Sequence, residues 1–289
     1  MAKFARKRWV AIQCTKTVSS GRPVFLRYVG RPRRPIQITD ASNVQSLLDR
    51  FGGLQPRTFY STANVYSHLE SAEDAADFEN VVACTPTWDI DNEAKKWEAT
   101  VDAAKDIVSF LEDEGVSKSV FVKWSGRGCH VHLHEASISP RLAAKLHPLN
   151  IAYAIVEYTN RSLREGFKRI STHRKARSLL VENEMDPQRL FTCPLSLHKS
   201  LDRVCVCVSL ADLDRFTPEW TSPSTYKHFN GWDKYVVGEA DELAQKAYTA
   251  VGPYAVFPYM PRTRRPPVRS FDRRDHELAT KDGFRARLT

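Results

Sequence analysis

The sequence predicts a mixed α/β fold (α+β), and two features of the 289-residue chain lead to this prediction. Between residues 81 and 134, a strand candidate, a long amphipathic helix and two further strand candidates follow one another, an order typical of a βαβ or split βαβ unit. Short segments rich in β-branched and aromatic residues flank this unit at 8–13, 23–29, 190–193 and 204–210. A chain of this length can bury a large core, as one elaborated domain or two small ones.

The N-terminal part is expected to begin with two strands joined by a turn at residues 19–21. Thr39 or Asp40 can cap a helix that runs to Phe51 and ends at two glycines. The aromatic and hydroxyl-rich stretch 57–66 follows, and it is either a strand that feeds the core or a surface that lines an active site.

The central unit places two carboxylates on one strand. Residues 81–91 form a strand candidate, and alternation puts Asp89 and Asp91 on the same face at its end. Residues 93–114 carry apolar side chains at three- and four-residue spacings, which predicts an amphipathic helix, and residues 116–124 return as a strand.

A glycine-flanked turn, which we call the glycine loop (residues 125–128), follows that strand. Its two glycines permit close approach of the backbone to a ligand, and its polar side chains can donate hydrogen bonds to phosphate oxygens. Strict alternation resumes afterwards and puts His130, His132 and His134 on one face of the next strand. The candidate phosphate-binding residues here are Ser125, Gly126, Arg127, Gly128 and His130.

After residue 134 the sequence patterns that predict helices and strands are more scattered. We expect a helix over 140–164 with a break near Pro148, a polar and basic segment at 168–177, and a helix over 239–248. From residue 258 onward proline, arginine and charge dominate, which predicts a flexible basic tail.

The net charge of +9 is unevenly distributed along the chain. Residues 1–39 carry ten Lys or Arg and no acidic residue, and residues 258–289 carry nine against four, which leaves 24 basic and 30 acidic residues between them. Basic arms of this kind favour contact with a phosphate backbone, although they also occur as tails that only improve solubility. The candidate nucleic-acid contacts are Arg31, Arg33, Arg34, Arg262, Arg264 and Arg265.

The six cysteines include no CxxC pair, so neither a disulfide framework nor a zinc ribbon is indicated and no structural zinc is expected. Cys193, His198, Cys205 and Cys207 could supply four zinc ligands, but their irregular spacing favours packing of the cysteines in the core. No apolar run approaches the roughly 18 residues of a membrane span, and the N-terminus lacks the apolar core of a signal peptide. We therefore expect a cytoplasmic, nucleoid-associated protein without a membrane partner.

The acidic pair is a candidate metal site. Asp89 and Asp91 on one strand face repel each other, and a divalent cation with oxygen ligands, Mg²⁺ or Mn²⁺, relieves that repulsion. A metal pair beside a cationic loop matches the two halves of a phosphoryl-transfer site. Asp186, just before a strand candidate, is the best candidate for a third carboxylate.

Three motifs in order resemble those of the archaeo-eukaryotic primase superfamily: Asp89-Ile90-Asp91, then Ser125 to His130, then Asp186 with Arg189-Leu190 and Pro194-Leu195-Ser196-Leu197-His198. The resemblance covers about residues 30–215 and is strongest to catalytic small subunits of archaeal primases and to single-chain primase-polymerases. The loop is one residue shorter than the family's usual form. No zinc-binding insertion is present, as in compact members such as the polymerase domains of bacterial end-joining ligases.

This resemblance implies a fold, a reaction and a set of roles. The fold would be the superfamily's catalytic core, an RRM-like antiparallel or mixed sheet packed by helices, with an N-terminal α/β module. Asp89, Asp91 and Asp186 would hold two Mg²⁺ or Mn²⁺ ions, and the glycine loop with His130 would bind the triphosphate. Arg189, Ser196, His198 and Lys199 would flank the nucleotide. The expected organisation is a catalytic domain over 1–257, made of a module to about 80, a metal-binding core over about 81–215 and an extension over 216–257, followed by the tail 258–289.

The implied activity is template-dependent nucleotidyl transfer on a single-stranded DNA template with NTPs or dNTPs, by a DNA primase or primase-polymerase. A primase large subunit or a replicative helicase is the kind of protein partner that the family implies. Whether the product is RNA or DNA, and whether synthesis starts de novo, is open at this point.

Two other functions use the same residues differently. A His-hydrophobic-His pattern on a strand is also the metal pair of rolling-circle nickases, in which a tyrosine on a following helix, here Tyr153 or Tyr158, attacks DNA. That scheme leaves the three aspartates and the Ser-Leu-His segment (residues 196–198) unexplained. A non-catalytic module that binds single-stranded nucleic acid would use the basic arms but has no need for placed carboxylates.

Overall fold

A five-stranded antiparallel sheet forms the centre of the computed structural model, which describes residues 1–254. Its strands lie in the order β11-β8-β10-β9-β13. Their bounds are Leu180–Glu182 (β11), Thr87–Asp91 (β8), Cys129–Leu133 (β10), Val120–Trp124 (β9) and Val206–Val208 (β13). β10 pairs in antiparallel register with both β8 and β9, so the unit predicted as βαβ or split βαβ is of the split kind.

A second antiparallel sheet is built mainly from the N-terminal segments, in the order β12-β5-β1-β2. Its strands are Leu190–Thr192 (β12), Pro56–Thr62 (β5), Val10–Thr17 (β1) and Pro23–Leu26 (β2). Two short hairpins accompany it: Tyr28–Val29 (β3) with Arg34–Pro35 (β4), and Asn64–Tyr66 (β6) with Val81–Cys84 (β7).

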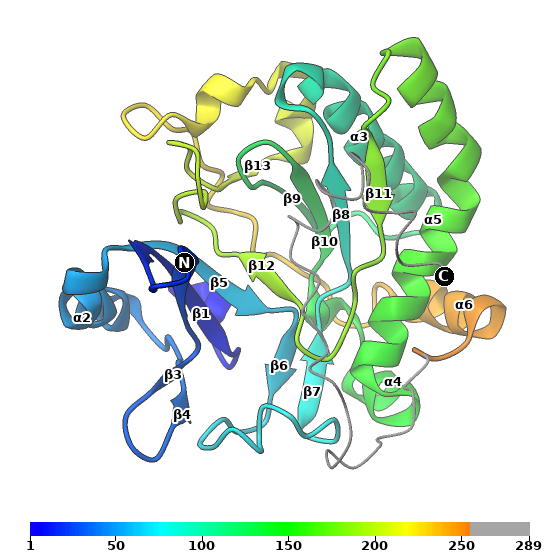
Figure 1. Ribbon diagram of the computed structural model, residues 1–289. Coiled ribbons are helices and arrows are strands. Elements are labelled where there is room, and N and C mark those ends of the chain that lie inside the picture. The colour runs from blue at the N-terminus through cyan, green and yellow to red at the C-terminus, as the bar shows by residue number, and fades with distance from the viewer. Residues whose placement is uncertain (255–289) are drawn as a thin grey trace, which may run out of the picture. The chain divides into compact units, whose positions relative to one another are not determined.

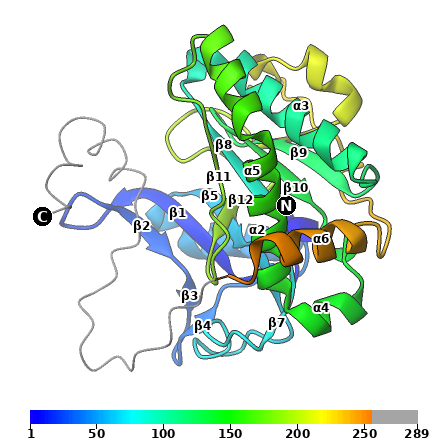
Figure 2. The same cartoon turned by 90° about the vertical axis from the view of Figure 1, so that its right-hand side faces the viewer.

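Two long helices cover one face of the five-stranded sheet (Figures 1 and 2). They are α3 (Trp97–Asp113) and α5 (Pro148–His173), which also contact each other. Trp88, Ile90 and Val131 point toward this helical layer and are fully buried, as alternation requires for one face of a sheet. The opposite face packs against the N-terminal residues and the second sheet, because Phe4 contacts the ring of His132 and Phe191 of β12 contacts the ring of His130.

The remaining helices are short. They are α1 (Ala2–Ala5), α2 (Ala41–Phe51), α4 (Pro140–Leu146) and α6 (Asp241–Val251), with 3₁₀ turns at Gly52–Leu54, Ala94–Lys96, Glu135–Ser137, Leu210–Arg215 and Pro218–Thr221. Of the two caps predicted for α2, Thr39 and Asp40, the structure has Asp40, whose carboxylate accepts from the backbone N–H groups of Ser42 and Asn43. The break predicted near Pro148 is present, since α4 ends before it and α5 begins at it.

The predicted mixed α/β class with an antiparallel sheet packed by helices is confirmed, and the differences are local. The segment 81–91 is two strands, β7 and β8, because Pro86 lies between them and a proline cannot donate to a strand ladder. The short helix α1 was not predicted. The tail 258–289 lies outside the described residues. Within residues 1–254, every helix is too short or too polar to cross a membrane.

Candidate active site

One cross-sheet row of side chains organises the candidate site. In the strand register Glu182 of β11 faces Asp89 of β8, Asp89 faces His130 of β10, and His130 faces Lys123 of β9. Directly paired residues of antiparallel strands project from the same face. This face is the one turned away from α3 and α5, so the four residues form a polar row inside the molecule.

Asp89 is the centre of this cross-sheet row. The residue is only 3% exposed, and its two carboxylate oxygens face different partners. Nε2 of His130 lies 3.2 Å from Oδ1, and a guanidinium nitrogen of Arg189 lies 3.1 Å from Oδ2. A buried carboxylate is stable only when positive or hydrogen-bonding groups surround it, and these two residues supply them.

Asp91 lies at the end of β8, where the glycine loop packs against it. A Cβ atom at Gly128 would lie 2.7 Å from the carbonyl oxygen of Ile90 and 3.0 Å from Oδ1 of Asp91. Such distances leave no room for a side chain at position 128. The glycine therefore lets the loop backbone lie directly against Ile90 and Asp91.

The glycine loop also packs against the Ser-Leu-His segment. Gly126 has a φ of +135°, and a Cβ atom there would lie 2.5 Å from Cδ2 of His198. Inside the loop, Ser125 N donates to Gly128 O over 3.0 Å and Nε1 of Trp124 donates to Gly126 O over 2.8 Å. The loop is thus fixed from both ends, and Arg127 at its tip is half-buried.

The Ser-Leu-His segment is anchored through both of its polar side chains. Oγ of Ser196 accepts a hydrogen bond from Phe59 N over 2.7 Å. Nδ1 of His198 accepts from the backbone N–H groups of Ser200 and Leu201, so a neutral His198 ring carries its proton on Nε2. Arg57 donates to the carbonyl oxygen of His198 over 2.9 Å, and the neighbouring Lys199 is half-buried.

Asp186 lies in the loop between β11 and β12 and is not part of the cross-sheet row. Its Oδ1 accepts from Gln188 N over 2.6 Å, and Asn64 donates to its backbone carbonyl. Burial raises the pKa of the Asp186 carboxyl, while that backbone hydrogen bond and the charge of Arg27 act in the opposite direction. Arg189, three residues further on, pairs with Glu184 as well as with Asp89.

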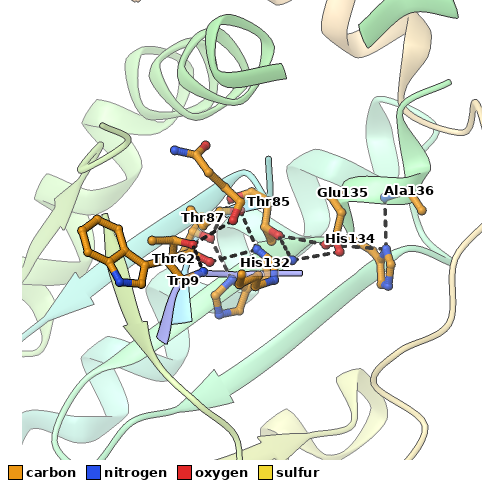
Figure 3. Close-up of polar contacts among 11 residues, drawn as sticks. Trp9, Thr62, Thr85, Thr87, His132, His134, Glu135 and Ala136 are labelled. Carbon is orange, nitrogen blue, oxygen red and sulfur yellow. Dashed lines mark hydrogen bonds and ion pairs between the residues drawn. The ribbon is translucent and has the colours of Figure 1, made fainter. Parts of the chain in front are cut away.

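His132 of β10 and His134, which directly follows that strand, belong to a buried polar network (Figure 3). Nδ1 of His132 lies 2.8 Å from Oγ1 of Thr87, and Nδ1 of His134 accepts from Ala136 N. Glu135 pairs with Arg8 over 2.8 Å and accepts from Thr85. Burial keeps the pKa of His132 well below its ordinary value, with the nearby positive groups acting in the same direction. These contacts are those of structural histidines.

Two members of the cross-sheet row were missed by sequence reasoning. Glu182 belongs to no motif singled out in the sequence, and nothing local marks its partner as Asp89. Lys123 is fully buried, with Nζ 4.1 Å from the ring centre of Phe4. Desolvation lowers the pKa of this lysine. Strand pairing is a long-range property, so these neighbours become visible only in the fold.

The donor set suits a hard divalent cation. Asp89, Asp91 and Glu182 offer carboxylate oxygens, the ligands that Mg²⁺ and Mn²⁺ prefer. Within residues 1–254, no three His, Cys, Asp or Glu side chains are grouped as a ready metal site. Mg²⁺ commonly binds through one or two carboxylates with substrate phosphates as further ligands, and the acidic pair fits that mode.

Other predicted residues lie away from this centre. Arg31, Arg33 and Arg34 are exposed around the β3–β4 hairpin, whereas Arg262, Arg264 and Arg265 lie outside the described residues. Cys193, Cys205 and Cys207 are buried, and burial raises the pKa of all three thiols. Tyr153 packs edge-on against Tyr254, and Tyr158 packs against Phe110.

Comparison with known proteins finds similarity in structure but not in sequence. No protein-family model matches the sequence, and no curated protein matches it either. Among solved structures, the chain is similar to the polymerase domain of ligase D from Mycobacterium tuberculosis, solved in complex with DNA. The TM-score is 0.51 at 13% sequence identity, over 88% of this chain and 85% of that one. This likeness shows a shared fold.

Proposed function

We propose that this protein is a template-dependent nucleotidyltransferase, a DNA primase or primase-polymerase. The observation that carries the proposal is the close packing of three distant motifs: Gly128 against Asp91, and Gly126 against His198. An acidic pair, a glycine loop and a Ser-Leu-His segment thereby meet at one point. The fold shared with a polymerase domain that was solved with DNA supports the same proposal.

In this proposal the glycine loop and the Ser-Leu-His segment hold the triphosphate of an incoming NTP or dNTP. Nε2–H of His198 and the side chain of Lys199 face the nucleotide, with Ser125 and Arg127 donating from the loop. His130 has a positioning role, because its Nε2 lies beside Asp89 and fixes the orientation of that carboxylate. Catalysis would then be mainly a matter of position and charge.

Asp89 and Asp91 would hold the Mg²⁺ or Mn²⁺ ions. When bound, such ions neutralise the charge that develops on the transferred phosphoryl group. Arg189 and His130 lie against the two oxygens of the Asp89 carboxylate, which is consistent with a centre built to receive positive charge.

For the third carboxylate we propose Glu182 in preference to Asp186. Glu182 shares the cross-sheet row with Asp89, whereas the Asp186 carboxylate accepts a backbone hydrogen bond within its own loop. The two residues are four positions apart, and both precede Arg189. Asp186 is better suited to hold the turn that carries Arg189 toward Asp89.

A single-stranded DNA template is the partner that this reaction requires, and the exposed Arg31, Arg33 and Arg34 are proposed as contacts to it. A primase large subunit or a replicative helicase would be a second class of partner. The reaction belongs to a cytoplasmic, nucleoid-associated enzyme. No observation within residues 1–254 favours the nickase, since His132 is committed to Thr87 and both candidate tyrosines pack against other rings.

The test is a nucleotide-incorporation assay on homopolymer single-stranded templates, with labelled NTPs or dNTPs, Mg²⁺ or Mn²⁺, and with or without a primer. We expect incorporation of the complementary nucleotide only, abolished by a chelator. The same reactions without primer distinguish de novo synthesis from extension. A covalent DNA–protein adduct that disappears in Tyr153→Phe or Tyr158→Phe, without incorporation, would replace the proposal by the nickase.

A further inference from the structure

A groove between helix α5 and the edge strand β11, which we call the α5–β11 groove, adjoins the cross-sheet row. It has a volume of about 700 Å³. One wall is a stripe of α5 that includes Asn160, Arg161, Arg164 and Lys168, positions that recur at helical spacing on one face. The other wall is β11 itself, ending in Glu182.

The helical wall belongs to a strongly basic segment of the chain. Residues 161–177 contain seven Lys or Arg and a single acidic residue, Glu165. Residues 40–257, which include this segment, contain 24 basic and 30 acidic residues. A concentration of positive charge in an otherwise acidic region indicates an anionic ligand that runs along it.

The groove side chains are available to such a ligand. Arg161, Arg164 and Lys168 are exposed, and the ion pairs of Arg161 with Glu157 and of Lys168 with Glu165 lie on the surface. Exposed pairs of this kind are weak, so a phosphate can compete for the cations. Amide and hydroxyl groups between them suit phosphate and sugar oxygens.

Glu182 relates the position of the groove to that of Asp89. It lines the groove and, in the cross-sheet row, faces Asp89. The glycine loop joins β9 to β10, on the opposite side of β8 from β11. In strand order, the acidic pair of β8 therefore lies between the strands joined by the triphosphate-binding loop and the edge strand β11, and the groove lies between that edge and α5.

Nucleotidyl transfer also requires a fixed order of the attacking 3′-oxygen, the metal-bound α-phosphate and the departing pyrophosphate. The attacking 3′-oxygen and the departing pyrophosphate lie roughly in line on opposite sides of the α-phosphorus. With the triphosphate held on the β9–β10 side, a 3′-end that comes around the β11 edge of the sheet at Glu182 would approach from the opposite side. We infer that the α5–β11 groove binds the phosphodiester backbone of the strand that is extended, the primer; this inference rests on the proposed function.

The test removes three groove charges together, in Arg161→Gln/Arg164→Gln/Lys168→Gln. All three side chains are exposed, and circular dichroism and thermal unfolding verify that the fold is unchanged. A matched control, Arg50→Gln/Arg141→Gln/Lys145→Gln, removes three exposed cations of α2 and α4. The probe is a labelled single-stranded DNA oligonucleotide, with affinity measured by anisotropy over a range of salt concentrations.

The expected result is weaker binding by the groove variant, with the slope of log K against log salt reduced by about 0.7 for each phosphate that the protein no longer neutralises. In primer extension the KM for the primer should rise while the KM for the nucleotide stays unchanged. The control should match the wild type in both measurements.

An unchanged salt slope and an unchanged primer KM would overturn the inference while leaving the proposed function intact. A raised KM for the nucleotide alone would also overturn it, because it would place the triphosphate in the groove. If the wild type incorporates no nucleotide, the proposed function fails, and an unaltered salt slope then overturns the groove as well. A reduced slope in that case would support a groove that binds a nucleic-acid strand.

Discussion

Glu182 lies directly opposite Asp89 in the β8–β11 pair, on the face that also carries His130. Two carboxylates side by side in a mostly buried row repel each other unless a cation is near. Arg189 supplies part of that charge to Asp89 in the structure. A divalent ion would supply more of it.

This relationship predicts different effects for two similar substitutions. Glu182→Gln should lower nucleotide incorporation by roughly 10³-fold, since a metal ligand contributes several kcal/mol to the transition state. Asp186→Asn should lower it less than about 30-fold, because the amide oxygen can still accept from Gln188 N. Steady-state incorporation at saturating Mn²⁺ measures both. The reverse ranking would identify Asp186 as the metal ligand.

The contact between Gly126 and His198 predicts a steric effect. Gly126→Ala should lower the free energy of unfolding by roughly 1–3 kcal/mol and weaken nucleotide binding, because its Cβ would meet the His198 ring at 2.5 Å and its φ of +135° disfavours a side chain. Denaturant unfolding and nucleotide titration measure the two effects.

Gly52→Ala serves as the control for that substitution. No described atom lies within 4 Å of a Cβ atom there, and its backbone is helical, with φ −49° and ψ −40°. The control should leave stability unchanged or raise it by up to about 1 kcal/mol. Equal behaviour of the two variants would show that the contact between the loop and His198 is not tight in solution.

Because Glu135 pairs with Arg8, we expect the stability of the fold to decrease in acid. Burial raises the pKa of the Glu135 carboxyl, but the charges of Arg8 and His134, together with hydrogen bonds that include one from Thr85, outweigh it and lower the pKa to about 2. A depressed carboxyl pKa stabilises the fold above the unfolded pKa of about 4.3, and this contribution disappears as the pH falls toward 2.

Glu135→Gln should accordingly remove roughly 2–4 kcal/mol at about pH 7, because Arg8 is left buried without its counter-charge. The difference from the wild type should shrink between about pH 4.5 and about pH 2. Asp212→Asn, which breaks a surface pair with Arg215, should change stability by less than about 1 kcal/mol. A pH-independent difference for Glu135→Gln would contradict the pairing.

Because Lys123 is buried, we expect the stability of the fold to depend on pH in the alkaline range. Desolvation lowers the pKa of this buried ammonium, and no hydrogen-bond acceptor for Nζ lies within reach in residues 1–254. Between the lowered folded pKa and the unfolded value of about 10.4 the unfolded chain binds more protons, so stability rises with pH in that window.

Replacing this lysine by a methionine removes the ionisable group at similar volume. Lys123→Met should raise the free energy of unfolding at about pH 7 by roughly 1–3 kcal/mol and flatten its rise toward about pH 10. Urea unfolding at several pH values measures this. A destabilised variant with the same pH slope as the wild type would show that the lysine charge is stabilised by the fold.

Local signals predicted most elements and the candidate motifs. The cap at Asp40, the proline at 148 and the period-two pattern after Gly128 are properties of neighbouring residues, and the structure places a helix start, a helix break and a strand there. The contact of Gly126 with His198 joins residues 72 positions apart, and only the motif order in the sequence suggested it.

The candidate third carboxylate shows what local reasoning misses. Asp186 stands just before a strand, as a ligand often does, whereas Glu182 ends a strand of three residues. Which of the two faces Asp89 depends on the register between β11 and β8, and a shift by one residue would turn Glu182 to the other face. Register is set by packing of the whole sheet, so it could not be read from the sequence.

Asp91→Asn tests most directly whether the acidic pair belongs to a metal-dependent nucleotidyl-transfer centre. Asp113→Asn, an exposed carboxylate at the end of α3, is the matched control. The measurement is template-directed nucleotide incorporation with Mn²⁺, beside oligonucleotide affinity and thermal unfolding. We expect incorporation by Asp91→Asn to fall by roughly 10³-fold or more with affinity and unfolding unchanged, and wild-type behaviour for Asp113→Asn. Near-normal incorporation by a folded Asp91→Asn variant would contradict the assignment.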